Sequence, residues 1–283
     1  MTVGLGLVAV AIVLLFWWRS GDDAPASVRR DGVIRIGYAV EAPYAFLTPD
    51  GKVTGESPEI ARVIAARLGI PRVEWRLAEF DSLIEGLEAR RFDVIAAGMF
   101  ITPARAGEVA FSSPTFQVRP GLLVRKGNPR RLHSYADIVK DAGARIAVLT
   151  GSVAERWLRH CGFPAAQLVQ VPDAQAGCAL VRDAQADGLV LSAPTIRWMA
   201  IQNDHGQTEM AEPFGDTNSA FAPAPGLGAF AFRKGNRSLR KAWNAELKKL
   251  IGSDEHRRLI SGFGFSPAEM PGRAPDNPSV PTP

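Results

Sequence analysis

Residues 33–37 (VIRIG), 73–77 (VEWRL) and 94–97 (VIAA) are short apolar-rich runs that predict three β-strands. Between them, apolar side chains recur at helical spacing over residues 60–68 and again over residues 83–87. The third run is apolar throughout, as expected of a strand that is buried on both faces. This β-α-β-α-β order predicts a parallel sheet covered by helices on both sides.

A second α/β unit follows, and then the chain returns to the first one. Strands are predicted at residues 146–149, 168–171 and 188–191, with a helix in each of the two intervals between them. Two further strands are predicted at residues 121–125 and 229–233. Helices at 239–251 and 255–261 are expected to pack back on the first unit. We therefore predict two α/β lobes joined by a hinge of two crossing segments. A ligand would bind in the cleft between them, at the carboxyl ends of the strands.

The lobe boundaries follow from this order of elements. Residues 33–118 and 221–268 are assigned to the first lobe and residues 119–220 to the second. Residues 1–32 are assigned to an export segment and linker, because residues 3–18 are all apolar or Gly. A cleaved signal peptide and a retained anchor both remain open, and both place the protein in the periplasm. Residues 269–283 form a Pro-rich tail.

The composition excludes several classes of function. The net charge is +4 and the Lys and Arg residues are scattered, so we expect no nucleic-acid binding. The two Cys and four His residues show no metal-ligand spacing, and we predict neither metal nor cofactor. In an oxidising compartment Cys161 and Cys178 are compatible either with a disulfide or with two buried thiols. We expect a monomer.

Four segments carry a resemblance to a known family: residues 34–46 (IRIGYAVEAPYAF), 80–87 (FDSLIEGL), 91–105 (RFDVIAAGMFITPAR) and 109–116 (VAFSSPTF). They resemble the polar amino-acid and opine binding proteins of bacterial ABC importers, extracellular solute-binding protein family 3. Within that family, AGMFITP, EAPYAFL and the terminal FGFSPAEMPG look most similar to the ectoine and hydroxyectoine binding proteins. The resemblance implies a type II periplasmic-binding-protein fold, a membrane permease and an ATPase as partners, and no chemistry on the ligand.

The first-lobe site residues follow from this resemblance. Arg105 lies one turn into a helix that Thr102 is expected to cap, with Pro103 at its first position. A guanidinium holds a carboxylate through parallel hydrogen bonds, and in the family this Arg clamps the ligand's carboxylate with help from the Thr.

An aromatic box is predicted opposite this clamp. Tyr44, Phe80 and Phe100 are aromatic at cleft-lining positions, and Phe100 replaces the small hydroxyl residue of common amino-acid binders. Such rings suit a delocalised cation. Glu41, three residues before Tyr44, would meet the ligand's N–H groups.

The second lobe is expected to supply three more contacts. Ser192 stands where typical amino-acid binders have the Asp that holds an α-ammonium group, which argues against a free α-amino group on the ligand. Gly151 and Ser152 open a helix, and their backbone N–H groups are expected to face the ligand's carboxylate across the cleft. Glu155 and Trp157 follow them without a diagnostic pattern, and Trp198 is expected in the core.

Taken with the resemblance, these residues predict a non-enzymatic clamp for a small zwitterionic solute such as ectoine or hydroxyectoine. Three alternatives stay open. One is a binder for a polar amino acid, which Phe100 and Ser192 disfavour. Another is a periplasmic cyclohexadienyl dehydratase on the same fold, for which Glu41 is the one general acid that the sequence offers. The third is a sensor or anchored receptor domain.

Overall fold

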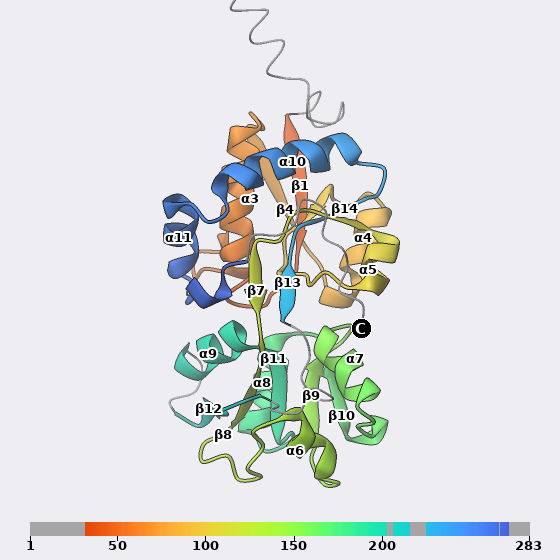
Figure 1. Cartoon of the computed structure of the whole chain (residues 1–283), viewed down its shortest axis with the longest axis vertical. Helices are drawn as coiled ribbons and strands as arrows, with labels where there is room; N and C mark the ends of the chain where they lie inside the picture. Colours follow the sequence, from red (N-terminus) through yellow and green to blue (C-terminus); the bar gives the residue numbers. More distant parts are fainter. Residues whose placement is uncertain (1–31, 203–205, 216–224, 266, 272–283) are drawn as a thin grey trace, which may run out of the picture.

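The computed structural model describes residues 32–202, 206–215, 225–265 and 267–271. The apolar run at residues 3–18 and most of the Pro-rich tail lie outside these ranges. Within them, no helix is long and apolar enough to cross a membrane. Two lobes lie one above the other, each with its own sheet and its own helices (Figure 1).

The first lobe is built on a five-stranded sheet of order β4-β1-β5-β14-β6. Its strands are β1 (Val33–Tyr38), β4 (Arg72–Leu77), β5 (Val94–Ile95), β6 (Ala110–Phe111) and β14 (Ala231–Phe232). β1 pairs in parallel with β4 and β5, whereas β14 runs antiparallel between β5 and β6. A small hairpin, β2 (Phe46–Leu47) and β3 (Val53–Thr54), encloses a turn at residues 49–51.

Helices cover this first sheet, and two of them come from the end of the chain. They are α3 (Glu56–Arg67), the 3₁₀ turn η1 (Phe80–Ser82), α4 (Leu83–Glu88), α5 (Pro103–Glu108), α10 (Arg237–Leu250) and α11 (Asp254–Ser261). Trp243 of α10 is fully buried and stacks edge-on against Phe230 and Phe232. The prediction that the C-terminal helices pack on the first lobe is therefore confirmed.

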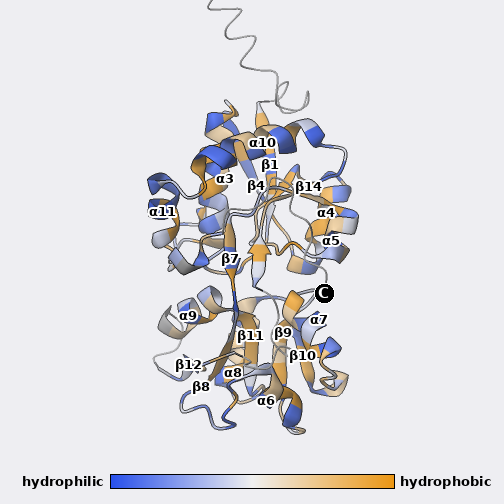
Figure 2. Cartoon of the chain, viewed as in Figure 1, coloured by the Kyte–Doolittle hydropathy of each residue, from blue (hydrophilic) through white to orange (hydrophobic). Residues whose placement is uncertain are grey.

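The second lobe repeats the pattern with a sheet of order β10-β9-β11-β8-β12. Its elements are β8 (Pro120–Arg125), α6 (Tyr135–Lys140), β9 (Ile146–Leu149), α7 (Val153–His160), η2 (Ala165–Gln167), β10 (Leu168–Val171), α8 (Ala174–Arg182), β11 (Gly188–Ser192), α9 (Ala193–Gln202) and β12 (Thr208–Met210). Figure 2 shows the hydrophobic strands inside each lobe and hydrophilic residues along the outer helices. Every residue of β9 and β11 is buried, as their continuous apolar runs predict.

The lobes are joined by a two-stranded ribbon that the sequence did not predict. β7 (Phe116–Val118) pairs antiparallel with β13 (Gly226–Gly228), and both strands run between the lobes (Figure 1). Three-residue strands are too short to show a period, and the Pro/Gly/Ala-rich stretch before β13 is typical of a loop. The predicted hinge of two crossing segments is nevertheless present, and the final 3₁₀ turn η3 (Pro267–Glu269) lies against β7.

Cys161 is half-buried at the end of α7 and Cys178 is buried in α8, and in the structure both are thiols.

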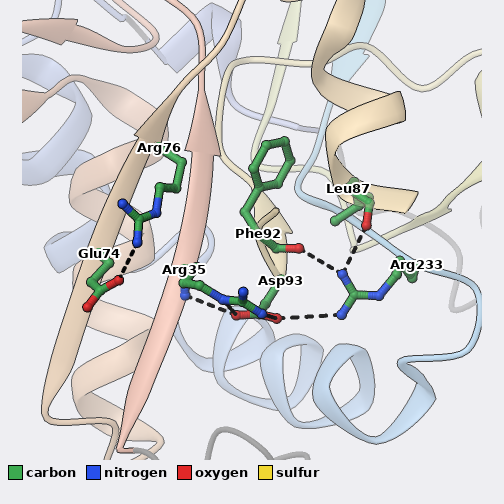
Figure 3. Close-up of polar contacts among 7 residues, drawn as sticks. All are labelled: Arg35, Glu74, Arg76, Leu87, Phe92, Asp93 and Arg233. Atoms are coloured by element: carbon green, nitrogen blue, oxygen red, sulfur yellow. Dashed lines mark hydrogen bonds and ion pairs between the residues drawn. The ribbon is translucent and has the colours of Figure 1, made fainter. Parts of the chain in front are cut away.

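A buried carboxylate fastens the returning strand β14 to the first-lobe sheet (Figure 3). Asp93, just before β5, accepts three hydrogen bonds from Arg35 of β1, one from its backbone and two from its guanidinium. On its other side Arg233, which follows β14, donates to Asp93 and to the carbonyl oxygens of Leu87 and Phe92. Asp93 thus joins three segments that are far apart in the sequence.

Substitution Asp93→Asn should lower the free energy of unfolding by about 2–3 kcal/mol, because an amide group would face donors of Arg35 where a carboxylate oxygen now accepts. Denaturant unfolding would measure this. The control is Glu74→Gln on neighbouring β4, whose ion pairs with Arg72 and Arg76 (the latter in Figure 3) are partly exposed and should together contribute less than about 1 kcal/mol. Equal effects of the two substitutions would contradict this prediction.

Candidate functional site

A cavity of about 80 Å³ lies between the lobes. Seven of the nine residues predicted for the site line it: Glu41, Tyr44, Phe80, Phe100, Arg105, Ser152 and Ser192. Glu41 and Tyr44 lie in the loop after β1, Phe80 in η1 after β4, and Phe100 and Arg105 after β5, in the loop before α5 and in α5 itself. Ser152 follows β9 and Ser192 ends β11 in the second lobe. The predicted clustering at the carboxyl ends of strands is therefore observed.

Arg105 is held in the cleft by the helix that the sequence predicts. Thr102 caps α5, its hydroxyl accepting a hydrogen bond from the Arg105 backbone N–H, and Pro103 is the first helical residue. The Arg105 side chain is 6% exposed and its guanidinium lies 5.2 Å from the centre of the Phe80 ring. Thr102 itself lies outside the cavity lining, one turn behind this guanidinium.

The Arg105 guanidinium also spans the cleft. Nη1 donates to the carbonyl oxygen of Phe100 at 3.0 Å, and Nη2 donates to that of Gly151 in the second lobe at 2.9 Å. An arginine has five N–H donors, so these two bonds leave three for another acceptor. Burial lowers the pKa of Arg105 to about 9, an effect that the nearby Arg156 increases, so the group is still a cation at neutral pH.

The predicted aromatic residues form part of a larger aromatic cluster. Tyr44 is almost fully buried and packs against Phe116 with ring centres 4.7 Å apart. Phe100 lies edge-on to the same Phe116 at 6.2 Å, and its ring covers Gly226 of β13. The cavity wall is therefore held in place by the hinge ribbon behind it. Trp157 and Tyr135 add two aromatic rings from the second lobe.

Glu41 is the buried acid of the cavity. Its Oε1 accepts a hydrogen bond of 2.9 Å from the hydroxyl of Thr195, across the cleft on α9. Burial raises the pKa of Glu41 to about 7, although the Thr195 hydroxyl and the Arg105 charge act in the opposite direction. Its loop is closed by backbone hydrogen bonds between Glu41 and Ala45.

The prediction for the backbone of Gly151 and Ser152 requires a correction. The Gly151 N–H donates to the Glu155 carboxylate at 2.8 Å, and the Ser152 N–H donates to the Leu149 carbonyl. Neither N–H therefore faces the cleft, and Gly151 presents its carbonyl oxygen to Arg105 instead. The reason is a helix-capping arrangement in which Ser152 caps α7 and Glu155 folds back over the first turn.

Sequence reasoning missed some residues of this region, and Thr195 is the principal one. It lies three residues after Ser192, whose hydroxyl accepts a weak hydrogen bond from the Thr195 N–H at the start of α9. That S-x-x-T spacing is a signal for helix capping and places both hydroxyls at one helix end. Trp198, expected in the core, instead packs half-buried against Phe46 of the first lobe, with ring centres 5.4 Å apart.

The model of the bacterial extracellular solute-binding proteins, family 3, matches residues 34–265. The chain belongs to this family. Its two-lobed architecture is that of the type II periplasmic binding proteins, as predicted. Among the described residues of this family 3 member, no group of three or more His, Cys, Asp or Glu is arranged to hold a metal ion.

Three relatives place the chain within family 3. A probable amino-acid ABC transporter periplasmic-binding protein, y4tE of Sinorhizobium fredii (strain NGR234), is 34% identical over 245 residues, 86% of this chain and 80% of that protein. The L-arginine-binding protein of Pseudomonas aeruginosa is 26% identical and the match covers 81% of this chain and 86% of the relative. The structure of EhuB in complex with hydroxyectoine aligns with a TM-score of 0.78 and 35% identity, over 85% of this chain and 91% of EhuB.

Proposed function

We propose that this protein is the periplasmic solute-binding component of a bacterial ABC importer and that it binds ectoine or hydroxyectoine without changing it chemically. The observation that carries this proposal is the pairing, in one cavity between the lobes, of a buried arginine with a buried carboxylate across three aromatic rings. Such a cavity matches a small ligand with an anionic group at one end and a delocalised cation at the other. Ectoines are cyclic amidinium carboxylates and have this charge pattern.

Arg105 would hold the ligand's carboxylate, using the N–H groups that do not bind Phe100 and Gly151. Phe80 already stacks with the guanidinium of Arg105, so it both orients that side chain and borders the ligand. Tyr44 and Phe100 would contact the amidinium through their ring faces, each contact contributing about 0.5–2 kcal/mol. Glu41 would accept the amidinium N–H groups. We assign supporting roles to Thr102, which caps α5, and to Ser152, which borders the cavity.

The similarity to EhuB and to amino-acid binding proteins supports the transport role, with a membrane permease as the partner that recognises the closed form. Closure would be a hinge-bending motion of the two lobes about the ligand. The ligand stabilises the closed state because it contacts both lobes only there.

Calorimetric titration of refolded protein with ectoine, hydroxyectoine and a panel of amino acids tests the proposal. Refolding removes any ligand carried through purification. Micromolar or tighter binding of the ectoines alone is the expected result. Preferential binding of an ordinary amino acid would keep the transport role but replace the ligand, and turnover of prephenate or arogenate would replace the function altogether.

The affinity for ectoine should fall as the pH is lowered below about 7. Glu41 binds the amidinium as a carboxylate, and its pKa in the closed cleft is about 7. Below that pH the ligand-free closed form is increasingly protonated at Glu41, so binding of the amidinium to it must release a proton, at a cost of up to tenfold in affinity per pH unit. Titrations between pH 5.5 and 8.5 measure this. The variant Glu41→Gln should bind more weakly and show no such dependence.

A further inference from the structure

Four side-chain oxygens form a continuous chain of hydrogen bonds that crosses the cleft twice. The Tyr44 hydroxyl donates to Ser192 Oγ at 2.8 Å, Ser192 Oγ lies 3.0 Å from Thr195 Oγ1, and Thr195 Oγ1 donates to Glu41 Oε1 at 2.9 Å. The two outer members belong to the first lobe and the two inner ones to the second. All four are buried, and Thr195 is 0% exposed. The chain therefore exists only when the lobes are closed.

The directions of these hydrogen bonds follow from the number of protons available. An ionised Glu41 can only accept, so Thr195 must donate its single hydroxyl proton to it. Thr195 Oγ1 can then only accept from Ser192, and Ser192 Oγ in turn accepts from Tyr44. Every hydroxyl proton is used, and the chain ends on the carboxylate. Chains of this kind strengthen each member in surroundings of low dielectric constant.

We infer that Thr195, which does not line the cavity, is a positioning residue that fixes the Glu41 carboxylate from the opposite lobe and so completes the cation-binding half of the site on closure. This inference rests on the proposed function for the chemical class of the ligand. In the open form Glu41 lacks this donor, so the acid reaches its binding geometry only together with the closed state. A cationic ligand therefore stabilises the closed state in two ways. It contacts both lobes itself, and it binds the Glu41 carboxylate in the position that Thr195 fixes only in that state.

The surroundings of Glu41 allow this role to be measured through pH. Arg105 on α5 is the cation that acts on it, and Tyr44 is the neighbouring titratable group in its own loop. Glu79 and Asp173, one from each lobe, line a second cavity that Glu41 also borders. The Thr195 hydroxyl stabilises the ionised form of Glu41, so its loss raises the pKa of Glu41 further.

The variant Thr195→Val keeps the shape of the side chain and removes the hydroxyl. Titrated with hydroxyectoine, it should bind about tenfold to a hundredfold more weakly at pH 7, because a hydrogen bond to a charged group is lost. The pH midpoint of binding should also move upward, because the hydroxyl that favours the ionised carboxyl group is gone. Thr195→Ser should restore both properties. Thr208→Val is the matched control, because Thr208 is a buried threonine of the second lobe whose hydroxyl has no partner in the described part of the chain.

A Thr195→Val variant with the affinity and the pH midpoint of the wild type would overturn the inference while leaving the proposed function intact. Failure of the wild type to bind hydroxyectoine would instead remove the proposed function. In that case the role of Thr195 in closure is tested by small-angle X-ray scattering of the variants without ligand. A larger radius of gyration for Thr195→Val than for Thr208→Val supports its role in closure, and equal radii overturn it.

Discussion

Replacement of Arg105 by alanine should weaken ectoine binding by at least about a hundredfold, because the ligand's carboxylate would be left without a partner in a cleft closed to water. Truncating one partner of a buried charge pair costs about 2–5 kcal/mol or more. Arg105 is almost fully buried, and its helix cap, its stacking on Phe80 and its two bonds to backbone carbonyls fix its orientation. Little of the binding energy would therefore be spent on ordering this side chain.

The comparison with Arg156→Ala makes this prediction specific. Arg156 donates to the same Gly151 carbonyl oxygen as Arg105, but it does so from the exposed side of α7. Its removal should change the affinity by less than about threefold, in line with the small contribution of exposed charges. Arg105→Lys should recover part of the loss, because an ammonium supplies charge but not the planar fork. Titration calorimetry measures all three, and an Arg105→Ala variant that binds as tightly as Arg156→Ala would refute the clamp.

Replacement of Gly228 by alanine should destabilise the protein by about 3 kcal/mol or more. An added Cβ would lie 1.8 Å from Cζ of the Phe116 ring, and other ring atoms lie at 2.2 and 2.4 Å. The ring has no free space to retreat into, because Phe116 is fully buried between Tyr44 and Phe265. Forced overpacking of a core typically costs 1–3 kcal/mol and sometimes more.

The same substitution should also weaken ligand binding, because Phe116 supports the rings of Tyr44 and Phe100. Gly262→Ala is the control. Gly262 already has helical dihedral angles and no atom near a Cβ, so alanine should be neutral or stabilise by up to about 1 kcal/mol. Thermal unfolding with and without ectoine separates the two effects. A Gly228→Ala protein that melts like Gly262→Ala would show that the ribbon adapts to the added methyl group.

Local signals predicted the elements and several of the site residues. The pair Thr102 and Pro103 places a helix start, and with it Arg105, without any knowledge of the remaining chain. Buried strands such as β9 and β11 are recognisable because a strand covered on both faces is apolar throughout. The S-x-x-E spacing of Ser152 and Glu155 is a local capping signal, and a glutamate that folds back over the first turn of a helix occupies a backbone N–H there, in this case that of Gly151.

Contacts between the lobes cannot be predicted from such local signals, because they depend on how the surfaces of two separately folded lobes meet. Nothing local to Thr195 indicates that its hydroxyl reaches Glu41, which lies 154 positions earlier in the chain. The Phe46–Trp198 contact and the pairing of β7 with β13 have the same origin. Such features follow from the geometry of closure and not from periodicity or capping.

The position of β14 also bears on the order in which the two lobes can fold. β14 lies inside the first sheet, between β5 and β6, yet it is made only after the whole second lobe. The second lobe is contiguous from β8 to β12 and so contains all its sheet partners within residues 120–210. It can fold early, whereas the first lobe keeps a gap in its sheet until residues 231–232 and Arg233 arrive. The slow step of folding should therefore be the closure of this non-local gap, with the second lobe already formed as an intermediate.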